Sequence, residues 1–297
     1  MFPLFLIIGI MEVVIRNIPN DYSIKNEVMS TRGKDFKIIC LGNSQTYYGI
    51  DPQYFDLPAY NCAHVSQQLH VDNFIFDKFI DSLDSLDYVF LNISYFSHLQ
   101  SFFDGQEAWR VKYYYLYYGY PKKEVPFKYQ FEFYNLNFSS LSNIIKGLTG
   151  TPLYHIDENG FGTLYNVNNK PVGWENCGNI VRQIHTIKPD SITLKHNYEC
   201  LENISKKCKE KGIQLILFTA PCWYTYTEIV DSVQLASSVE FADYFAQKYD
   251  NVVYLNYFTD DRFEADDFYD AYHLSNVGAK KMTLILNDYL KSKCNDY

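Results

Sequence analysis

The sequence has 297 residues, enough for one elaborated α/β domain or for two smaller domains. Its formal net charge of −9 argues against nucleic acid as a partner, and against binding to an anionic membrane by charge alone. The seven cysteines form no C-x-x-C pair and no zinc-finger spacing, and their odd number disfavours a disulfide framework.

The N-terminal segment is apolar. Residues 2–15 are interrupted only by Glu12, and Arg16 follows. This run is shorter than the roughly 20 residues of a membrane span, and it lacks the basic start and cleavage site of a secretory signal. It is a short or truncated membrane anchor, an uncleaved signal-like segment, or a helix that packs on the domain. We favour an anchor in residues 1–35, with a polar linker from residue 17, and a domain over residues 36–297.

The first predicted strand ends in a candidate nucleophile. Residues 36–41 are mostly apolar and run directly into Gly42-Asn43-Ser44, which indicates a buried strand followed by a tight turn. A serine on the rim of a sheet can act as a nucleophile, with helix-start amides to stabilise an oxyanion. The alternative is an ordinary strand-to-helix turn in which Ser44 or Asn43 caps the helix.

The remaining elements alternate between strands and helices. The predicted strands cover residues 59–65, 87–94, 213–220 and 252–257, and the predicted helices cover 66–83, 191–211, 229–249 and 276–291. Continuous apolar strands alternating with helices predict a parallel sheet covered on both faces. Residues 98–190 lack this regularity and contain the aromatic run 113–120, so we interpret them as an insertion or cap whose tyrosines could stack on sugar rings.

A second functional motif follows the last predicted strand. Asp270 and His273 are three residues apart, just before the final helix. In a turn, this spacing lets the carboxylate bind one imidazole nitrogen, which leaves the other nitrogen as a general base. The alternative is a surface acid and a capping histidine. Because ligands in such folds bind at the carboxyl ends of strands, Ser44 and this motif are expected at the same edge.

Together these motifs resemble the SGNH (GDSL-type) hydrolase superfamily. Gly42-Asn43-Ser44 is similar to its first block, and Asp270 with His273 is similar to its last block. The resemblance implies a flavodoxin-like three-layer α/β/α fold, with Ser44 as nucleophile, His273 as base and Asp270 as its partner. The apolar start, Arg16 and residues 19–22 (P-N-D-Y) resemble membrane-anchored SGNH-like proteins of bacterial envelopes.

The sequence departs from this family around the oxyanion hole. In the second block, Ala63 or Ser66 stands where the family has a glycine. The third block lacks the asparagine that usually follows its strand, since Asn92 lies inside the predicted strand. The possible substitutes are Gln45, His64, Tyr95 and Ser97. Loss of one oxyanion donor typically costs about 3 kcal/mol of transition-state stabilisation.

The resemblance implies a serine ester hydrolase or O-acyltransferase that acts on an acylated envelope glycan or a similar ester. An inactive envelope protein with a binding or scaffold role is the alternative, and a nucleotide or phosphate binder is disfavoured because no phosphate-binding glycine motif follows the first strand. The expected location is the bacterial envelope, periplasmic or extracytoplasmic, with a cytoplasmic location as the alternative. We expect no cofactor and no metal, although the aspartate pairs 260–261 and 266–267 could bind Ca²⁺ loosely.

Overall fold

The computed structural model describes residues 2–101, 107–132, 145, 147–176 and 185–294. Its contacts divide the chain into two units. The N-terminal unit comprises Met1–Thr31 and Phe102–His155, and the sheet unit comprises Arg32–Ser101 and Ile156–Tyr297. This division differs from the predicted boundaries at residues 35, 98 and 190, because only the first part of the predicted insertion groups with the N-terminal segment. Residues 102–106, 133–144, 146 and 177–184 of that insertion lie outside the described residues.

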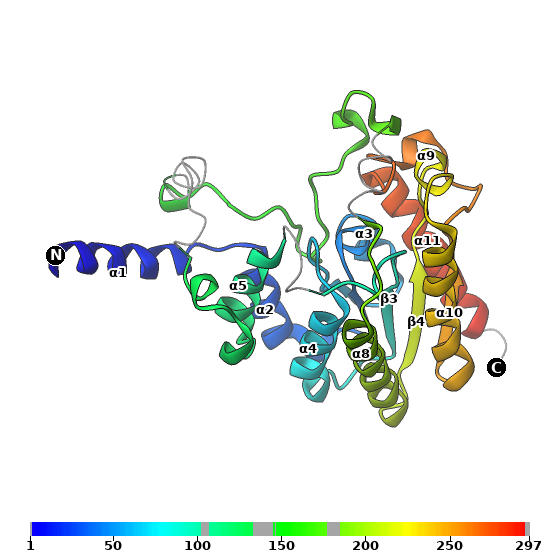
Figure 1. The fold of residues 1–297 in the computed structure, drawn as a ribbon, viewed down its shortest axis with the longest axis horizontal. Coiled ribbons are helices and arrows are strands. Elements are labelled where there is room, and N and C mark those ends of the chain that lie inside the picture. The colour runs from blue at the N-terminus through cyan, green and yellow to red at the C-terminus, as the bar shows by residue number, and fades with distance from the viewer. Residues whose placement is uncertain (1, 102–106, 133–144, 146, 177–184, 295–297) are drawn as a thin grey trace. The chain divides into compact units, whose positions relative to one another are not determined.

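Figure 1 shows the helices and strands in chain order. The helices are α1 (Phe2–Arg16), α2 (Asp21–Arg32), α3 (Ser44–Tyr47), α4 (Leu69–Phe79), α5 (Val111–Tyr113), α8 (Ser191–Glu210), α9 (Tyr224–Thr227), α10 (Ser232–Lys248) and α11 (Asn276–Cys294). The strands are β1 (Ile38–Leu41), β2 (Ala59–Asn61), β3 (Tyr88–Asn92), β4 (Gln214–Thr219) and β5 (Val252–Asn256).

The sheet unit is built on five parallel strands in the order β2-β1-β3-β4-β5. This is the flavodoxin-like strand order, so the predicted fold class is confirmed. The central strands are buried on both faces, which explains their continuous apolar sequences. Because all strands are parallel, their carboxyl ends lie along one edge of the sheet. The strand order changes direction between β1 and β3.

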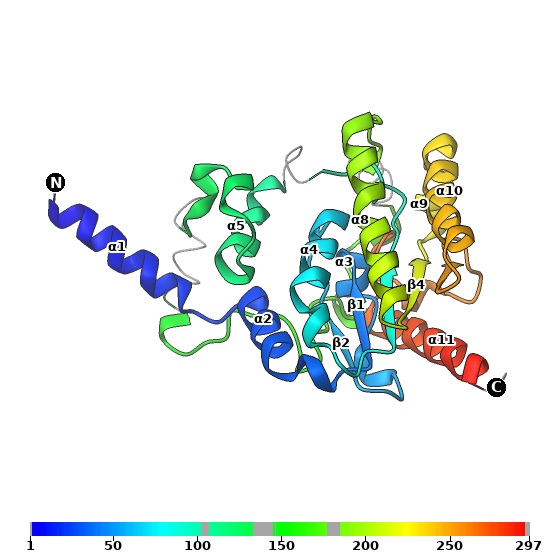
Figure 2. The same cartoon turned by 90° about the horizontal axis from the view of Figure 1, so that it is seen from below.

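Helices cover both faces of the sheet (Figure 2). On one face, Met282 and Leu286 of α11 join a buried cluster with Cys40, Phe90 and Phe218 of the strands. The helices α4 and α8 pack against each other, and Figure 2 shows them on the side of the strands opposite α11. The strands therefore form the middle layer of three, as expected for this fold class.

Two predicted elements differ from the structure near the site. β2 ends at Asn61 rather than at residue 65, and α4 begins at Leu69 rather than at residue 66. The reason is Ser66, which has a φ of 58° and lies in the left-handed region that helix residues do not adopt. The predicted polar linker also proves to contain a helix, α2.

The N-terminal unit packs its tyrosines against one another. Tyr114 and Tyr118 of the aromatic run are fully buried, and Tyr22 of α2 stacks on Tyr113 with ring centroids 4.6 Å apart. The expectation that this run offers open rings to sugars is therefore wrong for Tyr114 and Tyr118. Helix α1 has 15 residues, and several of its apolar side chains are more than half exposed (Leu6, Ile7, Ile10 and Val13). Among the described residues, no helix has both the length and the apolar character needed to cross a membrane.

Candidate active site

Ser44 lies at the end of β1 as the first residue of α3. The preceding Gly42 has a φ of 126°, and a Cβ there would approach Thr46 Oγ1 to 2.6 Å and Asn92 Cβ to 2.8 Å. Only glycine fits this turn without strain. Asn43 caps α3, because its Oδ1 accepts a hydrogen bond from the amide of Gln45 at 2.9 Å. The helix cap is thus Asn43, which leaves the hydroxyl of Ser44 for another role.

Asp270 and His273 lie in one closed turn before α11. An isolated antiparallel bridge between Phe268 and Leu274 closes the turn. Asp270 Oδ1 accepts hydrogen bonds from the amides of Tyr272 and His273, both at 2.8 Å. The carboxylate therefore organises the backbone of the turn in addition to its contact with the imidazole.

The structure brings Ser44, His273 and Asp270 into one hydrogen-bonded chain. His273 Nδ1 lies 2.9 Å from Asp270 Oδ2, and His273 Nε2 lies 2.8 Å from Ser44 Oγ. The side chains of His273 and Asp270 are only 14% and 17% exposed. A nucleophile, a base and a carboxylate that orients the base are thus within hydrogen-bond reach of one another, which is the arrangement of a serine catalytic triad.

The environment of Asp270 favours its ionised form. Burial alone would raise the pKa of this carboxyl. The opposing effects of His273, by charge and by hydrogen bonding, and of the amides of Tyr272 and His273 are larger together, and they hold the pKa of Asp270 below its ordinary value. An ionised Asp270 keeps the proton of His273 on Nδ1 and leaves Nε2 to accept the proton of Ser44.

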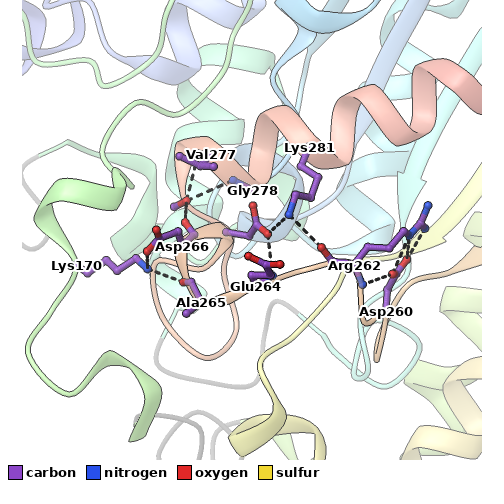
Figure 3. A network of polar contacts seen from close by, with 11 residues as sticks. Lys170, Asp260, Arg262, Glu264, Ala265, Asp266, Val277, Gly278 and Lys281 are labelled. Carbon is purple, nitrogen blue, oxygen red and sulfur yellow. Dashed lines mark hydrogen bonds and ion pairs between the residues drawn. The ribbon is translucent and has the colours of Figure 1, made fainter.

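The acidic loop before this turn, residues 260–267, forms ion pairs with basic side chains, as Figure 3 shows. The ion pairs are Asp260 with Arg262, Asp266 with Lys170, and Asp267 with Lys281. Lys281 of α11 also donates to the carbonyl of Arg262 at 3.0 Å, so the loop is fixed to the helix that follows the turn. Within the described part of the chain, no group of three His, Cys, Asp or Glu side chains could hold a metal ion.

Ser94 connects the nucleophile turn to the end of β3. Its hydroxyl lies 2.7 Å from Asn43 Nδ2, 2.7 Å from Gln45 Oε1 and 2.6 Å from Asn92 Oδ1. All four side chains are buried, so this network is shielded from water and fixes the two residues that flank Ser44. In the sequence, Ser94 is the last residue of the predicted strand 87–94, and no functional role was predicted for it.

Four of the predicted oxyanion residues make hydrogen bonds within the fold. The amide of Ala63 donates to Asn61 Oδ1 at 3.0 Å, and Ser97 Oγ accepts from the amide of Ser94 at 2.9 Å. The hydroxyl of Tyr95 accepts from the amide of Asp231 at 3.0 Å, at the start of α10. The side chain of Gln45 donates to the carbonyl of Tyr272 at 3.2 Å. The amide of Ala63 and the side-chain amide of Gln45 act as donors in these contacts, whereas the two hydroxyls act as acceptors. The assignment of these residues to the oxyanion hole stays a prediction.

The other two predicted residues lie between β2 and α4. His64 is buried, and its ring centroid is 6.5 Å from that of Tyr47. Ser66 occupies the left-handed turn described above and is partly exposed. Their assignment to the oxyanion hole stays a prediction.

Asp72 is a buried carboxylate behind the nucleophile turn. Its Oδ1 accepts hydrogen bonds from the amide of Gly42 at 2.7 Å and from Gln67 Nε2 at 2.6 Å. Burial raises the pKa of Asp72 to about 7, because these two hydrogen bonds offset the loss of hydration only in part. The sequence held no signal for this contact, since an aspartate in the first turn of a helix is usually a solvated residue.

We expect the variant Asp72→Asn to change how stability depends on pH. The folded-state pKa lies above that of the unfolded chain, so the folded state binds more protons between about pH 4 and pH 7 and the wild type loses stability as pH rises through this range. The asparagine keeps an oxygen acceptor for Gly42 and does not titrate. Its stability relative to wild type should therefore rise between pH 5 and pH 8, by up to about 3 kcal/mol. Thermal melting at both pH values measures this, and an equal difference at both would contradict it.

Comparisons with known proteins find solved structures that resemble this chain at low sequence identity. No protein-family profile and no curated protein sequence matches it. A structure from Streptococcus pneumonia, described as a proposed platelet activating factor, is 12% identical, with a TM-score of 0.45 over 97% of this chain and 99% of that one. A proposed acylhydrolase from Bacteroides fragilis is 11% identical, with a TM-score of 0.43 over 86% of both chains. A GDSL-like lipase from Bacteroides thetaiotaomicron is 10% identical, with a TM-score of 0.42 over 91% of this chain and 98% of that one.

Proposed function

We propose that this protein is a serine ester hydrolase of the SGNH type. The observation that carries the proposal is the hydrogen-bonded chain from Asp270 through His273 to Ser44, with contacts of 2.9 and 2.8 Å. It lies at the carboxyl edge of a parallel sheet, where ligands bind in this class of fold. The intact chain favours an enzyme over an inactive scaffold.

The proposed reaction proceeds through an acyl-enzyme. Ser44 Oγ attacks the ester carbonyl carbon, and His273 Nε2 takes the hydroxyl proton. The tetrahedral intermediate collapses, the carbon–oxygen bond to the alcohol breaks, and His273 gives its proton to the leaving alkoxide. Water then attacks the acyl-enzyme with His273 as the base again, which releases the acid and restores Ser44. Asp270 stays ionised throughout and stabilises the imidazolium.

The oxyanion is expected to bind near the start of α3. The amide of Ser44 is a first-turn helix amide, a type of group that points toward solvent and carries partial positive charge. The Ser94 network fixes the residues on both sides of this amide, so its direction is set before substrate binds.

The substrate is proposed to be an acylated glycan or a similar ester, and the acceptor is water or a sugar hydroxyl. Aromatic side chains near the carboxyl edge support a ring-shaped substrate: Trp223 follows β4, and its ring centroid is 5.1 Å from that of Trp174. Hydrolase and acyltransferase would use the same three residues and differ only in the acceptor.

A substrate panel tests this proposal. We expect release of acetate from acetylated sugars and short aryl esters, together with labelling of Ser44 by a fluorophosphonate. Addition of a sugar acceptor should divert the acyl group from water only if the enzyme is a transferase. Absence of both turnover and labelling in the wild type would contradict the enzyme and favour the scaffold role.

We also propose that the N-terminal unit attaches the protein to a membrane of a bacterial envelope. The support is the row of exposed apolar side chains on α1, which can enter the interfacial region of a bilayer without crossing it. Flotation of the full chain with lipid vesicles tests this, and a chain that stays with the unbound fraction would contradict it.

A further inference from the structure

Three tyrosine rings form a continuous stack beside His273. Tyr165 lies in the middle, with its ring centroid 3.7 Å from that of Tyr48 and 3.9 Å from that of Tyr269. The rings are nearly parallel, at 15° and 9°. Tyr48 directly follows the helix that begins with Ser44, and Tyr269 directly precedes Asp270. Tyr165 is therefore wedged between the segment that carries the nucleophile and the segment that carries its base.

The stack also covers the imidazole of His273. The centroid of Tyr165 is 5.2 Å from that of His273, at an interplanar angle of 69°, and Tyr48 approaches the same ring at 6.2 Å and 84°. Both faces of Tyr165 are already covered by tyrosines, so it is the edge of Tyr165 that meets His273. The hydrogen bonds of His273 act in the plane of its ring and resist tipping out of that plane only weakly. The neighbouring Tyr272 packs against the imidazole at 4.6 Å and 78°, and the ring edge of Tyr165 adds a second restraint against tipping.

Tyr165 belongs to a strap, residues 156–170, that is anchored upstream to the sheet. The amide of Asn61, at the end of β2, donates to the carbonyl of Asn159 at 2.9 Å, and the amide of Gly162 donates to the carbonyl of Tyr47 at 2.8 Å. A Cβ at Gly162 would lie 2.2 Å from the ring of Tyr47, so glycine is what permits this close approach.

Downstream, the strap is anchored to α11. The amide of Asn276 donates to the carbonyl of Tyr165 at 2.9 Å, and the side-chain oxygen of Asn276 accepts from the amide of Val167 at 2.9 Å. Lys170 then donates to the carbonyl of Ala265 at 2.5 Å (Figure 3). Fixed on both sides, the strap holds Tyr165 at one position relative to the triad.

We propose that Tyr165 is a positioning residue for the triad, which spaces the Ser44 segment from the His273 segment and keeps the imidazole in line with Ser44 Oγ. The inference rests on the proposed function. A misplacement of about 1 Å at such a site can cost on the order of a hundredfold in rate. The ring carries this role, so the hydroxyl of Tyr165 is not required for it.

Three strap variants test the role of the ring. We expect Tyr165→Ala to lower both kcat and the rate of fluorophosphonate labelling at Ser44 by about tenfold or more, with a smaller change in KM. Tyr165→Phe should restore both rates to within about twofold of wild type. The matched control is Leu164→Ala, at a neighbouring side chain of the same strap that is 43% exposed, and it should leave both rates unchanged. Equal rates for Tyr165→Ala and wild type would overturn the proposal.

A double-mutant cycle separates positioning from general loss of stability. Tyr165 and Asp270 would both orient the same imidazole, so the effects of Tyr165→Ala and Asp270→Asn on kcat should be less than additive. Strictly additive effects would overturn the proposal. The variant Asn276→Ala, which loses the acceptor for Val167, should reproduce part of the loss, whereas Asn276→Asp keeps the acceptor and should not. Failure of wild-type Ser44 to label at all would instead reject the proposed function.

Discussion

Replacing Ser44 by alanine is expected to lower kcat for ester hydrolysis by about 10⁴- to 10⁶-fold and to abolish fluorophosphonate labelling. The reason is that the variant has no oxygen to form the acyl-enzyme, so only water activated by His273 can attack the carbonyl. The residual rate then reflects substrate binding, oxyanion stabilisation and this weaker water attack. Steady-state kinetics and labelling of the purified chain measure the two effects.

The variant should fold normally, because Ser44 lies at the rim of the sheet and is only partly buried. Its melting temperature should stay within about 2 °C of wild type. Ser292→Ala is a suitable control, since Ser292 is an exposed serine near the end of α11. A variant at Ser44 that kept its esterase rate would place the reaction elsewhere in the chain.

The fold could be predicted from the sequence because its strands carry a strong pattern. Residues 38–41 and 214–219 are buried on both faces, so nearly every residue in each is apolar and no alternation weakens the signal. The apolar pattern that indicates strands and helices was weakest at residues 59–68. There a short edge strand and a left-handed Ser66 break the regularity, and both boundaries of the neighbouring elements were misplaced.

The proposed triad could be predicted because Ser44 directly follows the first predicted strand, and because Asp270 and His273 stand three residues apart just before the last predicted helix. Its supporting residues could not. Asp72 lies 30 positions from Gly42, its hydrogen-bond partner, and Tyr165 lies more than 100 positions from both Tyr48 and Tyr269. Such contacts depend on how helices and loops dock on the sheet, and no local pattern of residues encodes them. The assignments to the oxyanion hole stay predictions, and the sequence likewise carried no sign that Gln45 bonds to Tyr272 or Tyr95 to Asp231.

Replacing Asp270 by asparagine is expected to lower kcat by about 10⁴-fold while the surrounding geometry is retained. In the wild type, Asp270 Oδ1 accepts the amides of Tyr272 and His273. An asparagine oxygen will keep these two bonds, which turns the NH₂ group toward His273 Nδ1. That group donates to Nδ1, so the imidazole carries its proton on Nε2. A protonated Nε2 can no longer accept the proton of Ser44.

The stability of this variant carries a second signature. The folded-state pKa of Asp270 is held below 3.8, so ionisation of this group stabilises the wild type at neutral pH, and that stability is lost as pH falls through the folded-state pKa. Asp270→Asn should therefore be less stable than wild type at pH 7. The difference in free energy of unfolding between the two should disappear at acidic pH. Asp266→Asn is the matched control, because Asp266 is in the same loop with a side chain that is 84% exposed, and it should alter neither rate nor stability appreciably. Equal kcat values for Asp270→Asn and Asp266→Asn would show that the tautomer of His273 does not limit the reaction.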